Sequence, residues 1–480
     1  MPAKSASLQI IADNEALAEL ELSWNTAKFT SEDGLGPMAT LHQAGDALVA
    51  VGRVYDDGPE IIGSGVMVGP GLLLTATHVL DEFPKSSPPP LFMTFLESGM
   101  RAWLPKDVTT VSGSSEFGHD RKVVSDISLV GCTLNSDALA HRPLMLAPMQ
   151  VTLPLIGERL WAFGFRHGGI KAGAALLTPL VSSGLVTAAF PRGRGERLAS
   201  SCIEVDMDVR GGMSGGAVVN SDGYLVGIVS ASVSDGGPTY VTLIWEALRM
   251  RVKGSVPKLQ KVPQISLIGA RGEGLVKLKG NFHRDPFGDI KLSLSADEGQ
   301  LMVASLTDTQ RAEMRQNALD SDELEAFLED WGPEMEDVTG EAALRSLAGI
   351  SLPKMREFLE GSAIPPPCLD AIEAFSVEDF EGVEELDVTK SDAMEDGSIE
   401  FAFTIDVRSL IWTVDVSREA FAALEEDFLR AFFNVREENG VMRMETIQRR
   451  YFKGHVVFGR EAERFGNPVI KLSALRPPRR

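Results

Sequence analysis

The chain has 480 residues and a formal net charge of −22, and 44% of its residues are hydrophobic and 24% charged. Because domains usually contain about 100–200 residues, this length predicts two or three of them. The composition is typical of soluble globular proteins and excludes the disordered and fibrous classes. No apolar run approaches the roughly 18 residues of a membrane-spanning helix, so we expect a soluble protein without a membrane partner.

The negative charge is concentrated in one segment of the chain. Residues 301–400 contain 26 Asp and Glu against 6 Lys and Arg. Such a surface would repel phosphates, which argues against a nucleic-acid partner, and the short basic end from Arg476 to Arg480 does not reverse this. The change in composition near residue 301 predicts a domain boundary there.

Residues 1–35 are predicted to form an N-terminal extension. The acidic residues between Asp13 and Glu21 interrupt the apolar stretch that an export signal needs. The chain has 3 cysteines, an odd number, without CxxC spacing, so no disulfide framework is indicated. Both observations favour a cytoplasmic location.

Residues 36–255 are predicted to form an all-β domain. Short apolar, β-branched runs such as Leu72–Ala76, Leu160–Phe165 and Leu225–Ser230 alternate with Gly, Pro, Asp and Ser. This pattern is typical of a barrel or a sandwich. The run Leu243–Met250 has helical character and is expected to close the domain.

The remaining chain divides by its patterns into two parts. Residues 256–300 are predicted to be a β-rich bridging segment. Residues 301–480 are predicted to form an acidic α+β accessory domain, which is helical over 301–378 and mixed over 379–480.

The segment Gly211–Gly216 has the pattern of a nucleophile turn, with Ser214 between glycines. A serine hydroxyl becomes a good nucleophile only where a base takes its proton and backbone N–H groups await the oxyanion. Glycines on both sides allow the tight turn that exposes these groups. The N–H groups of Gly212 and Ser214 are the candidates for the oxyanion hole.

The base and its orienting carboxylate are expected at strand ends. His78 follows two predicted strands that a glycine turn joins, and Asp126 stands directly before the alternating run Ile127–Val130. A carboxylate that accepts a hydrogen bond from one imidazole nitrogen fixes the tautomer that the base requires. His78, Asp126 and Ser214 are therefore the candidate catalytic residues.

The segments Leu74–His78, Asp126–Leu129 and Gly212–Gly216 resemble the three signatures of the trypsin-like (chymotrypsin-fold) serine peptidase family, in that family's His, Asp, Ser order. The resemblance extends over residues 36–255. It implies two packed six-stranded antiparallel β-barrels with the triad in the cleft between them. It also implies peptide-bond cleavage through an acylated Ser214, with no metal and no cofactor.

The sequence departs from the digestive and clotting members of this family immediately before the nucleophile. Those members carry Asp at that position, and a freed N-terminus pairs with it to shape the oxyanion hole. Met213 stands there, so the domain is expected to be competent as made or to be switched by another element. The lack of disulfides and the segment Val205–Asp208 are more similar to bacterial intracellular or HtrA-like members, although no PDZ-like domain is evident.

The substrate pocket is less well defined by the sequence. Asp208 stands where the family places the base of the primary pocket, and a buried carboxylate there would favour Arg or Lys in the substrate. The alternative is that Asp206 or Asp208 belongs to a structural turn. The segment Ser230, Ala231 and Ser232 is expected to form the pocket wall and to pair with an extended substrate.

The leading hypothesis is a cytoplasmic, bacterial serine endopeptidase that cleaves proteins or peptides. Its residues 301–480 would bind a protein partner or restrain the protease, since this acidic part is unlike the catalytic domain. The alternatives are a catalytically inactive peptidase fold that serves as a binding or sensor protein, and an autoprocessing protein. The other histidines lack metal-ligand spacing, so no metal site is predicted.

Overall fold

The structure is a computed structural model. It describes residues 24–27, 44–55, 58–83, 88–96, 99–112, 123–134, 142–168, 170–171, 174–175, 177–194, 198–232, 238–253, 264–284, 290–308, 310, 318–319, 321–359, 362–394 and 396–475. Most of the predicted N-terminal extension therefore lies outside the described residues.

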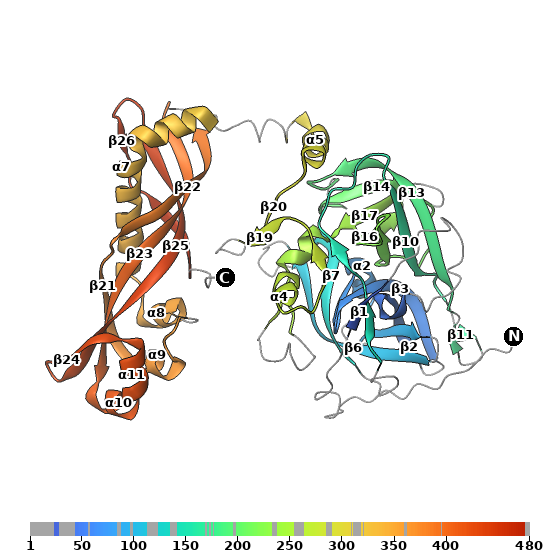
Figure 1. The fold of residues 1–480 in the computed structure, drawn as a ribbon, viewed down its shortest axis with the longest axis horizontal. Coiled ribbons are helices and arrows are strands. Elements are labelled where there is room, and N and C mark those ends of the chain that lie inside the picture. The colour runs from blue at the N-terminus through green and yellow to red at the C-terminus, as the bar shows by residue number, and fades with distance from the viewer. Residues whose placement is uncertain are drawn as a thin grey trace. The chain divides into compact units, whose positions relative to one another are not determined.

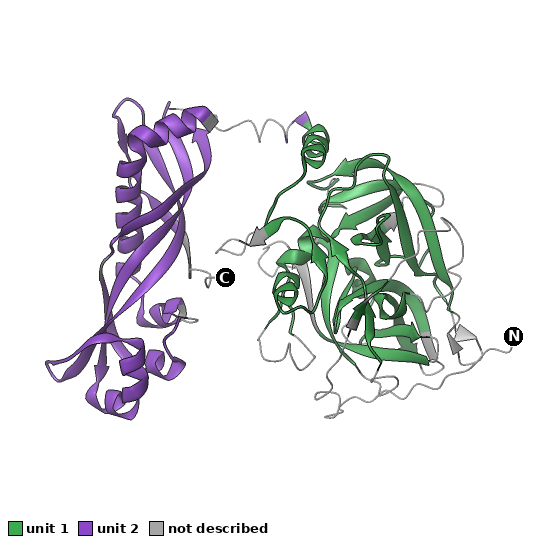
Figure 2. Ribbon diagram, viewed as in Figure 1, with its two compact units in different colours: residues 1–283, 290–307 green, residues 284–289, 308–480 purple. Residues whose placement is uncertain are grey.

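The chain divides into two compact units, which Figure 2 shows in different colours. The first unit comprises residues 1–283 and 290–307, and the second comprises residues 284–289 and 308–480.

The first half of unit 1 is a closed barrel of six antiparallel strands in the order β2-β3-β4-β7-β6-β5. The strands are β2 (Leu48–Tyr55), β3 (Gly58–Gly69), β4 (Leu72–Ala76), β5 (Leu91–Leu96), β6 (Gly99–Ser112) and β7 (Val123–Leu134). All five residues of β4 are buried, because the strand lies inside the sheet and its Thr75 also approaches Gly215 of the second barrel. Gly71, at a φ of 69°, makes the turn from β3 into β4.

The second barrel has the strand order β15-β10-β13-β14-β17-β16, and an additional pairing of β15 with β16 closes the ring. The strands are β10 (Arg159–Phe165), β13 (Pro179–Phe190), β14 (Cys202–Asp206), β15 (Ala217–Val219), β16 (Leu225–Ser232) and β17 (Thr239–Leu243). The predicted double barrel is therefore confirmed (Figure 1).

Short elements complete unit 1. They are β1 (Trp24–Thr26), η2 (Gly45–Ala47), α2 (Thr77–Asp81), β8 (Leu144–Leu146), β9 (Met149–Gln150), β11 (Ile170–Lys171), β12 (Ala174–Ala175), η3 (Ile244–Arg249), α4 (Leu267–Gly272), β18 (Leu278–Lys279), β19 (Phe282–Arg284), β20 (Ile290–Leu292) and α5 (Ala296–Ala304). Helix α5 begins with a capping box between Ser295 and Glu298, and Glu298 also accepts a 2.8 Å hydrogen bond from Leu153 N. The segment predicted as a β-rich bridge thus contains helices as well as strands.

A buried ion pair lies among the buried residues of the first barrel. The side chains of Asp46 and Arg101 are both fully buried, and Arg101 NH1 lies 2.5 Å from Asp46 Oδ2. Asp46 also accepts hydrogen bonds from Thr94 Oγ1 at 2.9 Å and from Met145 N at 3.0 Å. The carboxylate is thus hydrogen-bonded on both oxygens, as a buried charge requires.

Unit 2 is an antiparallel sheet with the order β21-β23-β25-β24, in which β22 pairs with β23 and both β26 and β27 pair with β25. Its strands are β21 (Ile372–Asp379), β22 (Gly382–Ala393), β23 (Ile399–Ser417), β24 (Phe433–Glu438), β25 (Val441–Gly459), β26 (Arg464–Phe465) and β27 (Val469–Leu475). Its helices are α7 (Ser321–Ala348), α8 (Leu352–Leu359), α9 (Pro366–Ala371), α10 (Arg418–Ala423) and α11 (Glu425–Ala431). The predicted α+β region is confirmed.

The long helix α7 lies along this sheet (Figure 1). Phe327 on α7 stacks on Phe401 of β23 with ring centroids 4.8 Å apart, and β23 alternates buried and half-buried residues along much of its length. The helical part ends at Ala371, and β21 begins at Ile372, earlier than the expected change near residue 378. None of the helices in the described part of the chain has the length and apolar character that a membrane crossing needs.

Candidate functional site

His78 lies at the point where a buried strand passes directly into a short helix. β4 ends at Ala76, and α2 begins with Thr77, whose Oγ1 donates a 3.1 Å hydrogen bond to Ser125 O of β7. This bond anchors the start of the helix to the neighbouring strand. The imidazole is 45% exposed and therefore accessible from solvent.

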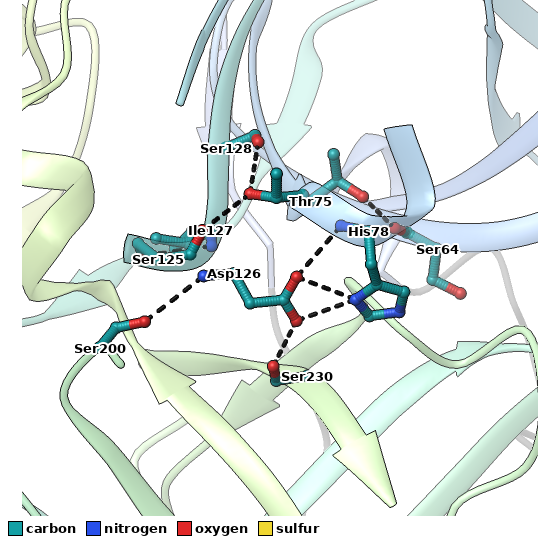
Figure 3. A network of polar contacts seen from close by, with 10 residues as sticks. Ser64, Thr75, His78, Ser125, Asp126, Ile127, Ser128, Ser200 and Ser230 are labelled. Atoms are coloured by element: carbon teal, nitrogen blue, oxygen red, sulfur yellow. Dashed lines mark hydrogen bonds and ion pairs between the residues drawn. The ribbon is translucent and has the colours of Figure 1, made fainter. Parts of the chain in front are cut away.

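Asp126 holds His78 at two points. His78 Nδ1 lies 2.9 Å from both carboxylate oxygens, and the backbone N–H of His78 donates to Oδ1 at 3.1 Å (Figure 3). The register of β4 against β7 pairs Ala76 with Ile127. His78 follows Ala76 by two residues and Asp126 directly precedes Ile127, so their side chains lie beside each other. With Nδ1–H donating its hydrogen bond to the carboxylate, Nε2 is the nitrogen left to accept a proton.

Two serines from the second barrel hold Asp126 in turn. Ser230 Oγ donates to Asp126 Oδ2, and the backbone N–H of Asp126 donates to Ser200 Oγ at 3.4 Å (Figure 3). Asp126 is only 15% exposed, so these hydrogen bonds take the place of lost water. The carboxylate is thereby fixed between the two barrels.

The pKa of His78 is raised above its usual range. Burial by itself lowers this pKa, but the hydrogen bond to Asp126, its negative charge and the charges of Glu82 and Asp81 outweigh that effect. The imidazole therefore gains a proton more readily than a free histidine does.

Ser214 lies in a turn between β14 and β15, and this turn packs against the end of β4. Gly215 has a φ of +80°, and a Cβ atom there would lie 2.2 Å from Ser64 O and 2.8 Å from Ala76 N. The turn thus approaches the strand end that carries His78. Between the described residues Ser214 and His78 no hydrogen bond is formed, and such bonds often tighten only when substrate is bound.

Hydrogen bonds hold the two peptide groups that carry the N–H groups of Gly212 and Ser214. Gly211 O accepts from His167 N at 2.8 Å, and Met213 O accepts from Gly216 N at 2.9 Å. In a trans peptide the N–H points away from the C=O, so these bonds direct the N–H groups of Gly212 and Ser214 away from their partners. Within the described residues neither N–H donates a hydrogen bond, which leaves both free for an oxyanion.

The backbone conformation and the close packing at position 212 require a glycine. Its φ is +95°, and a Cβ atom there would lie 2.3 Å from His167 N. Met213, the next residue, is 1% exposed, and its Sδ accepts a 3.5 Å hydrogen bond from Arg210 N. The Met213 side chain thus belongs to the hydrophobic core of unit 1.

The four residues predicted to bind substrate are not placed alike. Asp208 is 57% exposed and pairs with Arg210 at 2.6 Å, so its carboxylate does not have the buried position of a pocket base. Ser230 is 1% exposed and binds Asp126, which is a role that sequence reasoning missed. Ala231 and Ser232 extend β16 and pair with Tyr240 and Thr239, and their side chains lie outside the described residues.

Ser64 and Ser200 are further contributors to the site that the sequence did not indicate. Neither serine stands in a recognisable sequence motif. Their hydrogen-bond partners lie 148 residues from Ser64 and 74 residues from Ser200 along the chain. Ser230 lies in a segment that was singled out, but its partner Asp126 is equally remote. No local signal in the sequence could have found these contacts.

Comparisons with known proteins address the same part of the chain. No curated protein matches the chain. Among solved structures, the crystal structure of the MamO protease domain from Magnetospirillum magneticum in its apo form is 22% identical, with a TM-score of 0.31, and covers 43% of this chain and 95% of that chain. The family model of the trypsin-like peptidase domain matches residues 63–228, which include His78, Asp126 and Ser214. Residues 63–228 of this chain are therefore a trypsin-like peptidase domain, as the sequence resemblance predicted.

Proposed function

We propose that the protein is a serine endopeptidase with His78 as the base, Asp126 as its orienting carboxylate and Ser214 as the nucleophile. The observation that carries this proposal is the pair of 2.9 Å contacts from His78 Nδ1 to the Asp126 carboxylate, beside the turn that bears Ser214. A peptidase domain of this kind acts on proteins or peptides. The two unengaged N–H groups of Gly212 and Ser214 support the same function.

In this mechanism Ser214 Oγ bonds to the carbonyl carbon of the scissile peptide while its proton passes to His78 Nε2. The resulting oxyanion accepts hydrogen bonds from the N–H groups of Gly212 and Ser214. The carbon–nitrogen bond then breaks as His78 returns the proton to the leaving amine. Water hydrolyses the ester on Ser214, again with His78 as the base, and so restores the enzyme.

The substrate is expected to lie along the end of β16. Pairing of β15 with β16 runs from Ala217 opposite Ile228 to Val219 opposite Leu225, so it stops before Ser230. An extended peptide could pair with the backbone of Ser230 to Ser232 on that edge. Because Asp208 is exposed and paired with Arg210, we do not base a preference for Arg or Lys on it. Unit 2 has its own hydrophobic core, which supports a separate accessory role for it.

The substitution Ser214→Ala tests the catalytic assignment directly. Wild-type protein is expected to react covalently with a fluorophosphonate probe, and the variant is expected not to react, because the probe needs an activated hydroxyl next to an oxyanion hole. Mass spectrometry of the labelled chain measures the result. Ser201→Ala, which removes another buried hydroxyl of the domain, one that donates to Pro191 O, is the control and should still react.

Absence of wild-type labelling over the full pH range would favour an inactive binding protein instead. Self-cleavage would be visible in the same spectra, since a wild-type chain shorter than the Ser214→Ala chain indicates autoprocessing.

The pH dependence of labelling is expected to follow the ionisation of His78. Only the neutral imidazole can accept the proton of Ser214, so the rate falls as the pH drops through the pKa of His78. Because that pKa is raised, the midpoint is expected above the value of a free histidine, about 6.5. Glu82→Gln, which removes one of the raising charges, should move the midpoint to lower pH, while the remote and exposed Asp222→Asn should leave it unchanged.

A further inference from the structure

Ser64 on β3 takes part in four hydrogen bonds, of which two reach the turn bearing Ser214 and two reach the neighbouring strands β10 and β4. Its side chain is fully buried. Its Oγ donates to Gly212 O at 2.7 Å and accepts from Phe165 N at 2.8 Å. Its backbone N–H donates to Ser214 O at 2.8 Å, and its carbonyl accepts from Thr75 Oγ1 at 2.7 Å.

These contacts supply half of the restraint on the nucleophile turn. The carbonyls of residues 211 to 214 accept, in chain order, from His167 N, Ser64 Oγ, Gly216 N and Ser64 N. All four peptides are thereby fixed in orientation, including the two whose N–H groups face the oxyanion. The Ser64 hydroxyl is the one side-chain donor among these four, so it is the restraint that a substitution can remove.

The same serine joins the turn to both walls of the site. Thr75 Oγ1 connects it to β4, three residues before His78, and Phe165 connects it to β10 of the second barrel. The surroundings leave little room for adjustment, since a Cβ atom on Gly164 would lie 3.0 Å from both Ser64 Oγ and Met213 Cα. Ser64 thus relates the position of the nucleophile to that of the base.

We propose that Ser64 is a positioning residue that holds the nucleophile turn and the oxyanion N–H groups in their reactive geometry. This inference rests on the proposed function for its effect on rate. The hydroxyl touches neither His78 nor Asp126 in any contact of the described residues, so it acts through the turn and not through the ionisation of the base.

The test compares Ser64→Ala with Ser201→Ala in the full chain. Ser201 is also buried, and its Oγ donates to a backbone carbonyl, that of Pro191 at 2.6 Å, but it does not touch the turn. Ser64→Ala is expected to lower the rate of fluorophosphonate labelling by about 10- to 100-fold, because small misplacements of reacting groups have effects of that size. The midpoint of its pH profile should stay at the wild-type value, and Ser201→Ala should label at close to the wild-type rate.

Hydrogen exchange of the amides of Met213, Gly215 and Gly216, which donate to Arg210 O, Val229 O and Met213 O, gives a second readout that needs no activity. These amides are expected to exchange faster in Ser64→Ala than in wild type, and to be unchanged in Ser201→Ala. Labelling and exchange that both equal the wild type would overturn the role of Ser64. Faster exchange in a chain whose wild type never reacts would support the role in the turn and refute the proposed peptidase activity.

Discussion

Asp126→Asn is expected to lower the rate of Ser214 acylation by about four orders of magnitude while the fold is retained. With its one oxygen accepting from the His78 backbone N–H, the asparagine presents its NH₂ group to Ser230 Oγ, which can accept as well as donate, so the contacts between the barrels persist. Its NH₂ group, however, would face His78 Nδ1 and favour the tautomer with a proton on Nε2, which cannot accept the proton of Ser214.

The measurement is the second-order rate constant for fluorophosphonate labelling, with the thermal unfolding temperature recorded for each variant. Asp222→Asn is a suitable control because this exposed residue lies in the β15–β16 connection, outside the site. A rate for Asp126→Asn within about tenfold of the wild type would show that this carboxylate does not orient the base.

Arg101→Met is expected to destabilise the first barrel by about 3–5 kcal/mol, because it leaves the Asp46 carboxylate buried without its counter-charge. Methionine is similar to arginine in length, so the loss of volume is small and the electrostatic effect dominates. The remaining donors to Asp46 are Thr94 Oγ1 and Met145 N, which are neutral. Differential scanning calorimetry of the full chain measures the unfolding transition of unit 1.

The double variant Asp46→Leu with Arg101→Met separates this effect from simple loss of packing. It removes both charges and is expected to be less destabilising than Arg101→Met alone. Arg159→Met, at an exposed position, should change stability by no more than about 0.5 kcal/mol. If the loss of stability in the double variant equals the sum of the losses in Asp46→Leu and Arg101→Met, each measured alone, the buried pair does not act as a coupled unit.

The end of the helical part of unit 2 shows where local sequence patterns no longer predict the secondary structure. The sequence pattern predicts helical structure as far as residue 378, but β21 starts at Ile372 because the segment pairs with β23 from Ile372 opposite Val416 to Asp379 opposite Ile411. That pairing partner lies more than thirty residues further along the chain, and its backbone hydrogen bonds override a weak local preference.

The resemblance of residues 36–255 to the trypsin-like family added the double barrel to what the sequence pattern itself predicted, which was an all-β domain with the candidates His78, Asp126 and Ser214. Each of these depends on local requirements, such as a histidine after a buried strand or glycines that permit a positive φ beside a nucleophile, and such requirements are written in neighbouring residues. Only the tertiary structure decided which side chains support them. Asp208 pairs at the surface with Arg210, only two residues along the chain. Ser64 and Ser230 bind partners 148 and 104 residues away, because the packing of the two barrels brings these residues together and no local pattern encodes it.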